Sequence, residues 1–384
     1  MVTSAMTATT FLHGYLSFLR ETGWNVTLVC APGDGLVDLA REEGIALRAI
    51  PMRRDPSPLR DLVSLVRIAV LLRRLRPDVL VYATPKASLL GAVGGSIARV
   101  RTRTYEQWGL RLETATGLSS RILTAFEKLT ARLSTHIVAN SPSLAARIRE
   151  LGLNGGKPVY VLGEGSSHGV DVEHFSPARG HGRIDTETER FLLEESARLT
   201  VGFVGRLHPD KGIDTLLEAL LICADNHVPI RVVLVGSDEG ALLSHQLEEL
   251  RGRVAVRTVG ATSDVRPYMQ AMDVLVLMSK REGFPNVVLE AASLRTPAIV
   301  ADSTGTVDSV VDGITGLVVR TGDAAALAEA LMGLERDRPR IRQMGIEARL
   351  RVVSSFTQRV VWRLHSDFFL EARTSSYSGA RADD

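Results

Sequence analysis

The sequence predicts an α/β protein built on parallel sheets, and two observations support this prediction. Strand-like and helix-like patterns alternate from one end of the 384-residue chain to the other, and this order is typical of parallel strands joined by crossover helices. The chain is also 45% hydrophobic. At this length, that content is enough for two or three domains of roughly 150 residues each. We therefore expect at least two separate α/β cores.

The first half of the chain contains six strand-like segments separated by helical stretches. They are residues 24–32, 46–52, 78–84, 101–107, 136–141 and 157–163. A Rossmann-type sheet also needs a central first strand before the helix expected near residues 10–22, and only Met1 to Ser4 is available for it. Two explanations stay open: this strand is unusually short, or the gene starts further upstream.

The second half repeats the alternation after a charged stretch without a strand pattern, residues 178–197, which we expect to be a linker. Six further strands are expected at residues 201–204, 231–237, 254–260, 273–279, 297–302 and 315–319. Ligands in such sheets bind beyond the carboxyl ends of the strands. The loops that follow these strands are therefore the first place to look for a site.

Composition narrows the classes of partner. The formal net charge is +2, so the chain has no general basicity that would favour nucleic acid. Cys30 and Cys223 fall in different predicted domains, which argues against a disulfide framework or a metal cluster and fits a reducing cytoplasm. No apolar run approaches the ~20 residues of a spanning helix, and the N-terminus lacks a signal-peptide pattern.

Residues 281–302 combine two carboxylates, a flexible loop, a helix start and a buried strand. Gly283 allows a tight turn, and Pro285 suits a helix start because its missing N–H would be unpaired there. The helix is expected to open at Asn286, with Glu282 in the loop before it and Glu290 one turn inside. Two acids eight positions apart indicate little alone, since surface acids are common.

Residues 199–220 repeat the strand, glycine turn and helix order with basic side chains instead of acidic ones. Gly205 permits a close backbone approach after the strand. Arg206 and Lys211 are expected to project from the loop, where a planar guanidinium and a compact ammonium together suit a diphosphate. The sequence therefore predicts an anion site here.

The pairing of VGRLHPDKG (204–212) with EGFPNVVLEA (282–291) resembles the retaining glycosyltransferases of family 4. The resemblance covers nearly the whole chain and implies the GT-B fold, two Rossmann-like domains facing across a cleft. It implies that Arg206 and Lys211 hold the diphosphate of a nucleotide sugar and that Glu290 binds the ribose hydroxyls. Glu282 would hold the sugar, and Arg206, Lys211 and Glu282 would form the catalytic set. The other expected donor-binding residues are Gly165, Gly205, Gly236, Gly283, Phe284, Pro285, Asn286 and Val287.

The resemblance also implies a division of the chain. Residues 1–165 would form an acceptor-binding domain, onto which a C-terminal helix at 355–373 packs back. Residues 166–197 would be the interdomain loop and linker, and residues 198–354 the nucleotide-sugar-binding domain.

Acceptor contacts are expected on the loops of the first domain. The segment 105–117 resembles the acceptor loop of the branch that builds capsular and polyprenyl-diphosphate-linked oligosaccharides. Many relatives carry a His in this loop, whereas this chain has Gln107 and Trp108. The candidate acceptor residues are His13, Gly14, Lys86, Trp108, Arg111 and Glu113.

The expected activity is retaining, metal-independent transfer from a UDP-sugar to a polyprenyl-phosphate- or diphosphate-linked sugar, with no cofactor. A soluble small-molecule acceptor, sugar-nucleotide epimerisation or sugar-phosphate synthesis, and a catalytically inactive sugar-nucleotide-binding protein stay open as alternatives. The expected location is the cytoplasm, including peripheral association with the inner membrane face. The basic and apolar helix within residues 52–77 could lie on an anionic membrane, although a sheet-covering helix with solvated arginines is the simpler interpretation.

Overall fold

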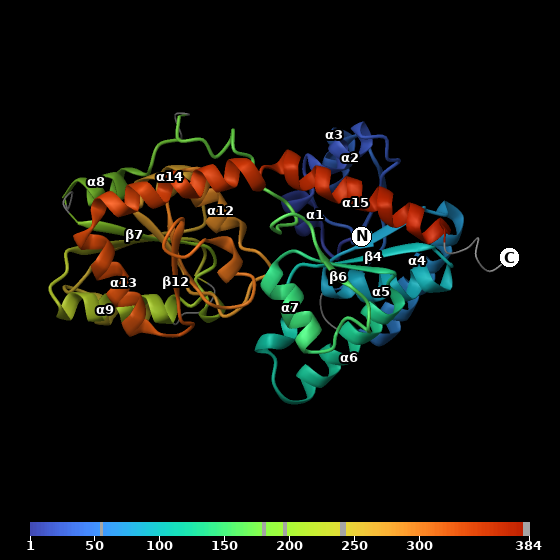
Figure 1. Ribbon diagram of the computed structural model, residues 1–384, viewed down its shortest axis with the longest axis horizontal. Helices are drawn as coiled ribbons and strands as arrows, with labels where there is room; N and C mark the ends of the chain where they lie inside the picture. Colours follow the sequence, from blue (N-terminus) through green and yellow to red (C-terminus); the bar gives the residue numbers. More distant parts are fainter. Residues whose placement is uncertain (54–56, 179–181, 195–197, 239–242, 379–384) are drawn as a thin grey trace. The chain divides into compact units, whose positions relative to one another are not determined.

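The computed structural model describes residues 1–53, 57–178, 182–194, 198–238 and 243–378. The chain folds as two compact units, and each is built on parallel strands (Figure 1). The first unit contains Met1–His168 and Gln358–Asp384, and the second contains Gly169–Thr357. This is the two-part, Rossmann-like α/β architecture of the GT-B fold that the sequence predicts.

The second unit is a six-stranded sheet with the order β12-β11-β10-β7-β8-β9, and every pair is parallel. Its strands confirm the six expected in this half of the chain. They are β7 (Leu199–Val204), β8 (Ile230–Val235), β9 (Ala255–Val259), β10 (Val274–Leu277), β11 (Ala298–Ala301) and β12 (Gly316–Val319).

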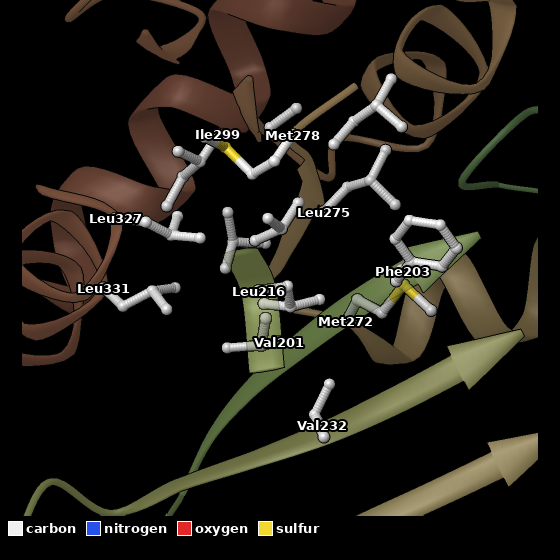
Figure 2. Close-up of a cluster of buried hydrophobic side chains, with 14 of the residues drawn as sticks. Val201, Phe203, Leu216, Val232, Met272, Leu275, Met278, Ile299, Leu327 and Leu331 are labelled. Atoms are coloured by element: carbon white, nitrogen blue, oxygen red, sulfur yellow. The ribbon is translucent and has the colours of Figure 1, made fainter. Parts of the chain in front are cut away.

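The core of the second unit lies on both sides of its central strands. Val201 and Phe203 of β7 are almost fully buried, as is Leu216 of the helix that follows. Leu327 and Leu331, more than a hundred residues further along, join the same cluster (Figure 2). Because β7 and β10 are covered on both faces, their sequences are continuous apolar runs rather than alternating ones. The helices here are α8 (Thr186–Glu194), α9 (Ile213–Asp225), α10 (Leu243–Leu250), α11 (Arg266–Ala271), α12 (Asn286–Ser293), α13 (Ala324–Arg336) and α14 (Arg338–Ser355).

The segment predicted to be a linker, residues 178–197, is in part a folded element of the second unit. Residues 186–194 form helix α8, and Asp185 stands just before it. The Asp185 carboxylate accepts hydrogen bonds from the backbone N–H and the hydroxyl of Thr188, and Arg257 of β9 donates to both residues. This capping and pairing fixes the start of a charged helix whose Phe191 and Leu192 pack against the core of the second unit. Helix α14 was not foreseen either.

The first unit has four parallel strands in the order β3-β4-β5-β6 and a parallel pair, β1 and β2. The first three residues connect them: Val2 N donates to Val29 O at 3.2 Å, and Ala83 N donates to Met1 O at 3.1 Å. Residues 1–3 therefore occupy the central position between β1 and β3 that a Rossmann sheet requires, without being assigned as a strand. The strands are β1 (Thr27–Cys30), β2 (Ala46–Ala49), β3 (Val79–Tyr82), β4 (Thr102–Gln107), β5 (His136–Ala139) and β6 (Val159–Val161).

The helix expected near residues 10–22 is divided in two at Gly14. This glycine has φ +76° and its N–H donates to the Glu43 carboxylate at 2.6 Å, so the chain turns there. The first unit contains helices α1 (Ala5–Phe11), α2 (Tyr15–Glu21), α3 (Leu36–Glu43), α4 (Pro58–Leu75), α5 (Pro85–Ile97), α6 (Gly117–Leu133), α7 (Pro142–Glu150) and α15 (Gln358–Ser378).

The helices of the first unit lie on two sides of its sheet. Right-handed crossovers place α4, α5 and α6 on one face, where α5 packs between the other two and against β3 and β4. Helix α15 packs on α2 and β4 at the other face, and Figure 1 shows it on the opposite side of the strands from α5 and α6. Trp362 anchors α15 in a core that includes Tyr15. Within the described ranges, no helix is both long and apolar enough to cross a membrane.

Candidate functional site

Two glycines set the shape of the second unit at the carboxyl ends of its central strands. Gly205 follows β7 with φ +149°, and Gly236 follows β8 with φ +143°. A Cβ on Gly236 would lie 1.8 Å from the carbonyl oxygen of Gly205, which no side chain can tolerate. Two neighbouring loops therefore begin with their backbones in direct contact, and Arg206 leaves the first of them with an exposed side chain.

The predicted cation and the predicted loop acid form an ion pair beside these glycines. Lys211 ends a short 3-10 turn (Pro209–Lys211), and Gly212 after it has φ +68°. A Cβ on Gly212 would lie 2.0 Å from the Met278 carbonyl oxygen, so this turn rests against the end of β10. From there Lys211 Nζ donates to Glu282 Oε1 at 2.5 Å. The sequence treated these two side chains as separate contacts, and the fold joins them.

A third side chain completes this group. The buried Ser279, two residues beyond β10, donates from Oγ to the same Glu282 oxygen at 2.8 Å. The Glu282 carboxylate thus receives one charged and one neutral hydrogen bond, while Lys211 is held in one direction. Such an arrangement fixes the direction of the Lys211 ammonium group, which therefore does not have to be set when an anion binds.

The loop that carries Glu282 is supported by a second loop, residues 303–306. Glu282 N donates to Thr304 O at 2.9 Å, and Ser303 Oγ donates to Ser279 O at 2.5 Å. A Cβ on Gly305 would lie 2.3 Å from the Gly283 carbonyl oxygen. The position of residues 282–285 is therefore set by backbone contacts with its neighbour.

Helix α12 begins as the sequence predicts, at Asn286, with Pro285 as its N-cap in an extended conformation. Phe284 is buried against Phe356, and this packing holds the start of the helix in place. Glu290 lies one turn into the helix and is half-buried, and burial raises the pKa of its carboxyl to about 7. The unpaired N–H groups of the helix start add partial positive charge to that of Lys211.

The structure therefore brings together most of the donor-side candidates within the second unit. Gly205, Arg206, Lys211, Gly236, residues 282–287 and Glu290 all follow or flank strands that end at one edge of a parallel sheet. Gly165 belongs to the first unit, so the fold of the second unit does not position it. Its φ is +111° and its N–H donates to Leu162 O at 3.0 Å.

The acceptor-side candidates follow strands at the carboxyl edge of the first unit's sheet. Trp108, just after β4, donates from Nε1 to Glu106 Oε2 at 3.3 Å. Its ring meets the His168 ring edge to face at 4.7 Å, and Phe11 stacks on the same imidazole at 4.7 Å, with the Phe11 and Trp108 rings 6.3 Å apart. Gln107 turns the opposite way and donates to the buried Glu127. The tryptophan is thus placed at the edge while its neighbour has a structural contact.

The other acceptor-side candidates are spread over this edge rather than gathered at one point. Lys86 donates to both carboxylate oxygens of Asp61 at 2.9 Å, and its side chain is only 13% exposed. The exposed His13 lies 3.7 Å from Glu42. Arg111 is exposed in a short 3-10 turn, and Glu113 of the same turn pairs with Arg147 at 3.4 Å.

Comparison with known proteins places this geometry in a family. A model described as glycosyl transferases group 1 matches residues 185–351, and a glycosyl transferase 4-like domain model matches residues 7–162. The capsular polysaccharide biosynthesis glycosyltransferase CapM of Staphylococcus aureus is 31% identical over 353 residues, covering 91% of each chain. The chain belongs to the group 1 glycosyl transferases. The family resemblance stated from its two motifs is therefore confirmed.

One further relative of this group 1 glycosyl transferase and one solved structure extend the comparison. The Escherichia coli UDP-Gal:alpha-D-GlcNAc-diphosphoundecaprenol alpha-1,3-galactosyltransferase is 25% identical over 344 residues, 88% of this chain and 87% of the relative. The crystal structure of Anabaena HepE in complex with UDP and glucose matches with a TM-score of 0.74 at 18% identity, covering 96% and 98% of the two chains. That structural match supports the fold.

One polar cluster in the first unit of this glycosyl transferase was missed from the sequence. Glu106 of β4 and His365 of α15 are both buried, and His365 Nδ1 lies 3.0 Å from Glu106 Oε1. Burial by itself would raise the pKa of Glu106, but His365 brings that pKa below its usual value. The pair links residues 259 positions apart. Its only signal in the sequence is an acid in the strand pattern RTRTYEQ, which is too weak to name a partner.

Proposed function

We propose that this glycosyl transferase moves a sugar from a UDP-sugar to a polyprenyl-diphosphate-linked sugar, with retention at the anomeric carbon and without a metal ion. The observation that carries the proposal is the Lys211–Glu282–Ser279 group at the start of helix α12, with Arg206 exposed on the loop after β7. These side chains and the helix start form a positively polarised site. A diphosphate is the leaving group that such a site stabilises best.

In this mechanism the protein accelerates the reaction by stabilising the leaving group. As the bond between the anomeric carbon and the diphosphate oxygen breaks, negative charge grows on the diphosphate. Arg206 and Lys211 stabilise that charge, and their effect is large because Lys211 is already oriented by Glu282 and Ser279. The pairing also leaves Glu282 a poor nucleophile, since its carboxylate is neutralised by Lys211.

Retention then follows from a same-face reaction. The acceptor oxygen forms its bond to the anomeric carbon on the side from which the diphosphate departs. The acceptor proton passes to a diphosphate oxygen, so no protein base and no covalent intermediate are needed. Glu282, with the backbone of residues 283–285, holds the sugar hydroxyls, and Glu290 accepts hydrogen bonds from the ribose.

Two observations favour a lipid-linked acceptor over a soluble one. The names of the relatives from Staphylococcus aureus and Escherichia coli refer to capsular polysaccharide and to a diphosphoundecaprenol acceptor. Residues 109–117 also resemble the acceptor loop of that branch. We place the reaction at the cytoplasmic face of the membrane, where Trp108, Arg111, Glu113, Lys86, His13 and Gly14 would contribute to the acceptor side.

The experiment that tests this function has two stages. Thermal-shift screening of UDP-, GDP- and ADP-sugars identifies the donor, because a ligand at 100 times its Kd adds about 2.7 kcal/mol of stability. The selected donor is then incubated with a short-chain polyprenyl-diphosphate sugar, and the anomeric configuration of the product is read by NMR. An inverted product, or donor binding with no transfer to any lipid-linked or soluble acceptor, would reject the proposal.

Glu290 gives the reaction a pH dependence. Only the ionised carboxylate accepts hydrogen bonds from both ribose hydroxyls, and burial raises its pKa to about 7. Affinity for the UDP-sugar should therefore be constant above pH 8 and fall toward roughly tenfold per pH unit well below pH 7. Calorimetry across this range provides the measurement. Glu290→Gln should bind more weakly at pH 8 and lose the pH dependence; an unchanged profile in this variant would assign the titration to another group.

The Glu290 carboxyl also makes the free energy of unfolding depend on pH, and this dependence runs opposite to that of donor affinity. The folded pKa is raised above the usual value of 4.5, so folding favours the protonated form. This stabilising preference is complete below the unfolded pKa and is lost as the pH rises from about 4.5 to about 7. Donor affinity and unfolding free energy should therefore change in opposite directions over this interval, provided that no other group dominates.

Activity should survive chelation of divalent ions. Arg206, Lys211 and the helix start supply the positive charge that a metal ion would otherwise provide. The nearest imitation of a metal motif is Asp171-Val172-Glu173, and there the Asp171 carboxylate accepts the N–H groups of Glu173 and His174 at 3.0 and 2.9 Å. Turnover should be equal with and without EDTA after dialysis. Loss of activity that Mg²⁺ restores would contradict this prediction.

A further inference from the structure

We propose that the outer surface of helices α4, α5 and α6 is a docking face for an anionic lipid bilayer. Its members are apolar side chains that point away from the sheet. They are Leu59, Leu62, Val63, Val66 and Val70 on α4; Leu89, Val93 and Ile97 on α5; and Leu118, Ile122, Phe126 and Leu129 on α6. The role of this bilayer face rests on the proposed function, because a lipid-linked acceptor would be located at a membrane.

Helix α4 is apolar on two sides, which explains why its sequence fits both a sheet-covering helix and a membrane-surface helix. Ile68, Ala69 and Leu72 are buried toward the sheet, as expected for a sheet-covering helix. On the opposite side, five apolar side chains have exposed fractions from 40% at Val70 to 82% at Leu59. The sheet-covering interpretation is therefore correct for the inner side only. A surface that serves nothing but solubility would carry polar residues in those places.

Helix α6 repeats this pattern, and α5 connects the two. The exposed apolar side chains of α6 range from 41% exposed at Leu129 to 72% at Leu118. Between the outer helices, Leu89, Val93 and Ile97 follow one another at four-residue spacing along the outer side of α5. Arg73 of α4 donates to the carbonyl oxygen of Ile97 at 3.3 Å, which joins the two helices at that end. The apolar stripes therefore lie on three adjacent helices of one layer.

The charges on these helices select an anionic partner. All seven exposed charged side chains of the three helices are basic: Arg60, Arg67, Arg73 and Arg74 on α4, and Arg121, Lys128 and Arg132 on α6. The same helices contain two acids, and the contacts of both are directed inward. Asp61 pairs with Lys86, and the buried Glu127 accepts hydrogen bonds from Tyr105 and Gln107.

Apart from Arg73, the basic residues stand beside the apolar stripes rather than within them. Arg60, Arg67 and Arg74 recur every seven residues, two helical turns, and so form a row along one flank of α4. Arg121, Lys128 and Arg132 form a similar row on α6, at spacings of seven and four residues. Apolar side chains bordered by long basic ones match the boundary between acyl chains and phosphate headgroups. On the other face of the sheet, α3 instead exposes charges of both signs, Asp38, Arg41 and Glu42.

The test is co-sedimentation with vesicles of phosphatidylcholine and phosphatidylglycerol, and with phosphatidylcholine alone, at low and high salt. The wild-type chain should sediment with the anionic vesicles and be partly released by salt. Leu62→Gln/Val66→Gln on α4, and Ile122→Gln/Phe126→Gln on α6, should each lower the partition coefficient about tenfold. Arg67→Glu should lower it about fivefold or more, because each basic residue near an anionic surface contributes that factor.

The matched control is Leu350→Gln/Val353→Gln, which replaces two exposed apolar side chains on α14 of the second unit. This control should sediment like the wild type. Failure of the wild-type chain to bind anionic vesicles, or an equal loss in the control, would overturn the bilayer face. So would a dimer in size-exclusion chromatography that the α4 and α6 variants dissociate, because the face would then belong to a second copy.

A transfer assay separates this proposal from the function on which it rests. With a water-soluble short-chain acceptor, the α4 and α6 variants should retain wild-type turnover, whereas with the acceptor embedded in anionic vesicles their turnover should fall with their binding. Normal turnover of a lipid-linked acceptor by a chain that never binds vesicles would reject the docking face and leave the proposed function standing.

Discussion

Replacing Lys211 with Met should lower kcat by about two to three orders of magnitude while the fold persists. One preorganised donor to a developing negative charge typically contributes this much. Lys211 is suited to the role because Glu282 and Ser279 fix its direction, with Nζ 2.5 Å from the Glu282 carboxylate. Met keeps most of the side-chain volume, so the packing around the turn should survive. Steady-state kinetics with saturating UDP-sugar and acceptor measures the effect, and Arg206→Ala should behave similarly.

The neighbouring lysine provides the matched control. Lys280 makes a looser contact with Asp214, at 3.6 Å, and both side chains are more than 40% exposed. Lys280→Met should therefore leave kcat close to the wild-type value. Near-wild-type turnover by a well-folded Lys211→Met enzyme would remove this residue from the leaving-group site.

Because Lys211 and Glu282 form an ion pair, a substitution of Glu282 tests whether the two side chains act together. Glu282→Gln removes the negative charge that neutralises Lys211 but can still accept its hydrogen bond. If Glu282 acts mainly by orienting Lys211, the double variant Lys211→Met/Glu282→Gln should be little worse than Lys211→Met alone, and any further loss measures the separate contact of Glu282 with the sugar. Effects that simply add would mean that the two side chains act independently, since residues acting as a unit are strongly non-additive.

Local patterns were sufficient to predict the sheets. A few neighbouring residues are enough to predict the apolar runs of β7 and β10, the glycine turns after them and the start of α12 at Asn286. What could not be predicted depends on contacts between distant segments. The Lys211–Glu282 ion pair joins positions 71 residues apart, and the Glu106–His365 pair joins positions 259 apart. One sequence shows which residues are suited to such contacts but not which of them meet.

The two surprises among the helices have the same origin. Helix α8 is a charged segment that is held both by the contacts of Asp185, Thr188 and Arg257 and by the packing of Phe191 and Leu192 against the core. Helix α4 has apolar residues on two opposite sides, and only its neighbours decide which side is buried. In both cases tertiary contacts determine the outcome, and the local sequence pattern does not predict it.

The last prediction concerns the backbone contact on which the site is built. Gly236→Ala would place a Cβ 1.8 Å from the Gly205 carbonyl oxygen, at a φ of +143° that side chains rarely adopt. Since both partners are backbone at the ends of adjacent central strands, neither can move without distorting the sheet edge. We expect a loss of about 3 kcal/mol or more in the free energy of unfolding. This corresponds to a fall of roughly 6 °C or more in the melting midpoint.

The control for Gly236→Ala is Gly252→Ala. Gly252 also has a positive φ, +74°, but a Cβ there meets no atom within 4 Å. Its replacement should therefore cost only the backbone strain, about 1 kcal/mol. Thermal melts followed by circular dichroism compare the two, and UDP-sugar binding reports on the site below the melting range. Because the carbonyl of Gly205 immediately precedes Arg206, Gly236→Ala should also weaken donor binding in the protein that remains folded. Equal melting midpoints for the two variants would mean that the loops after β7 and β8 are less closely joined than the contact between Gly205 and Gly236 requires.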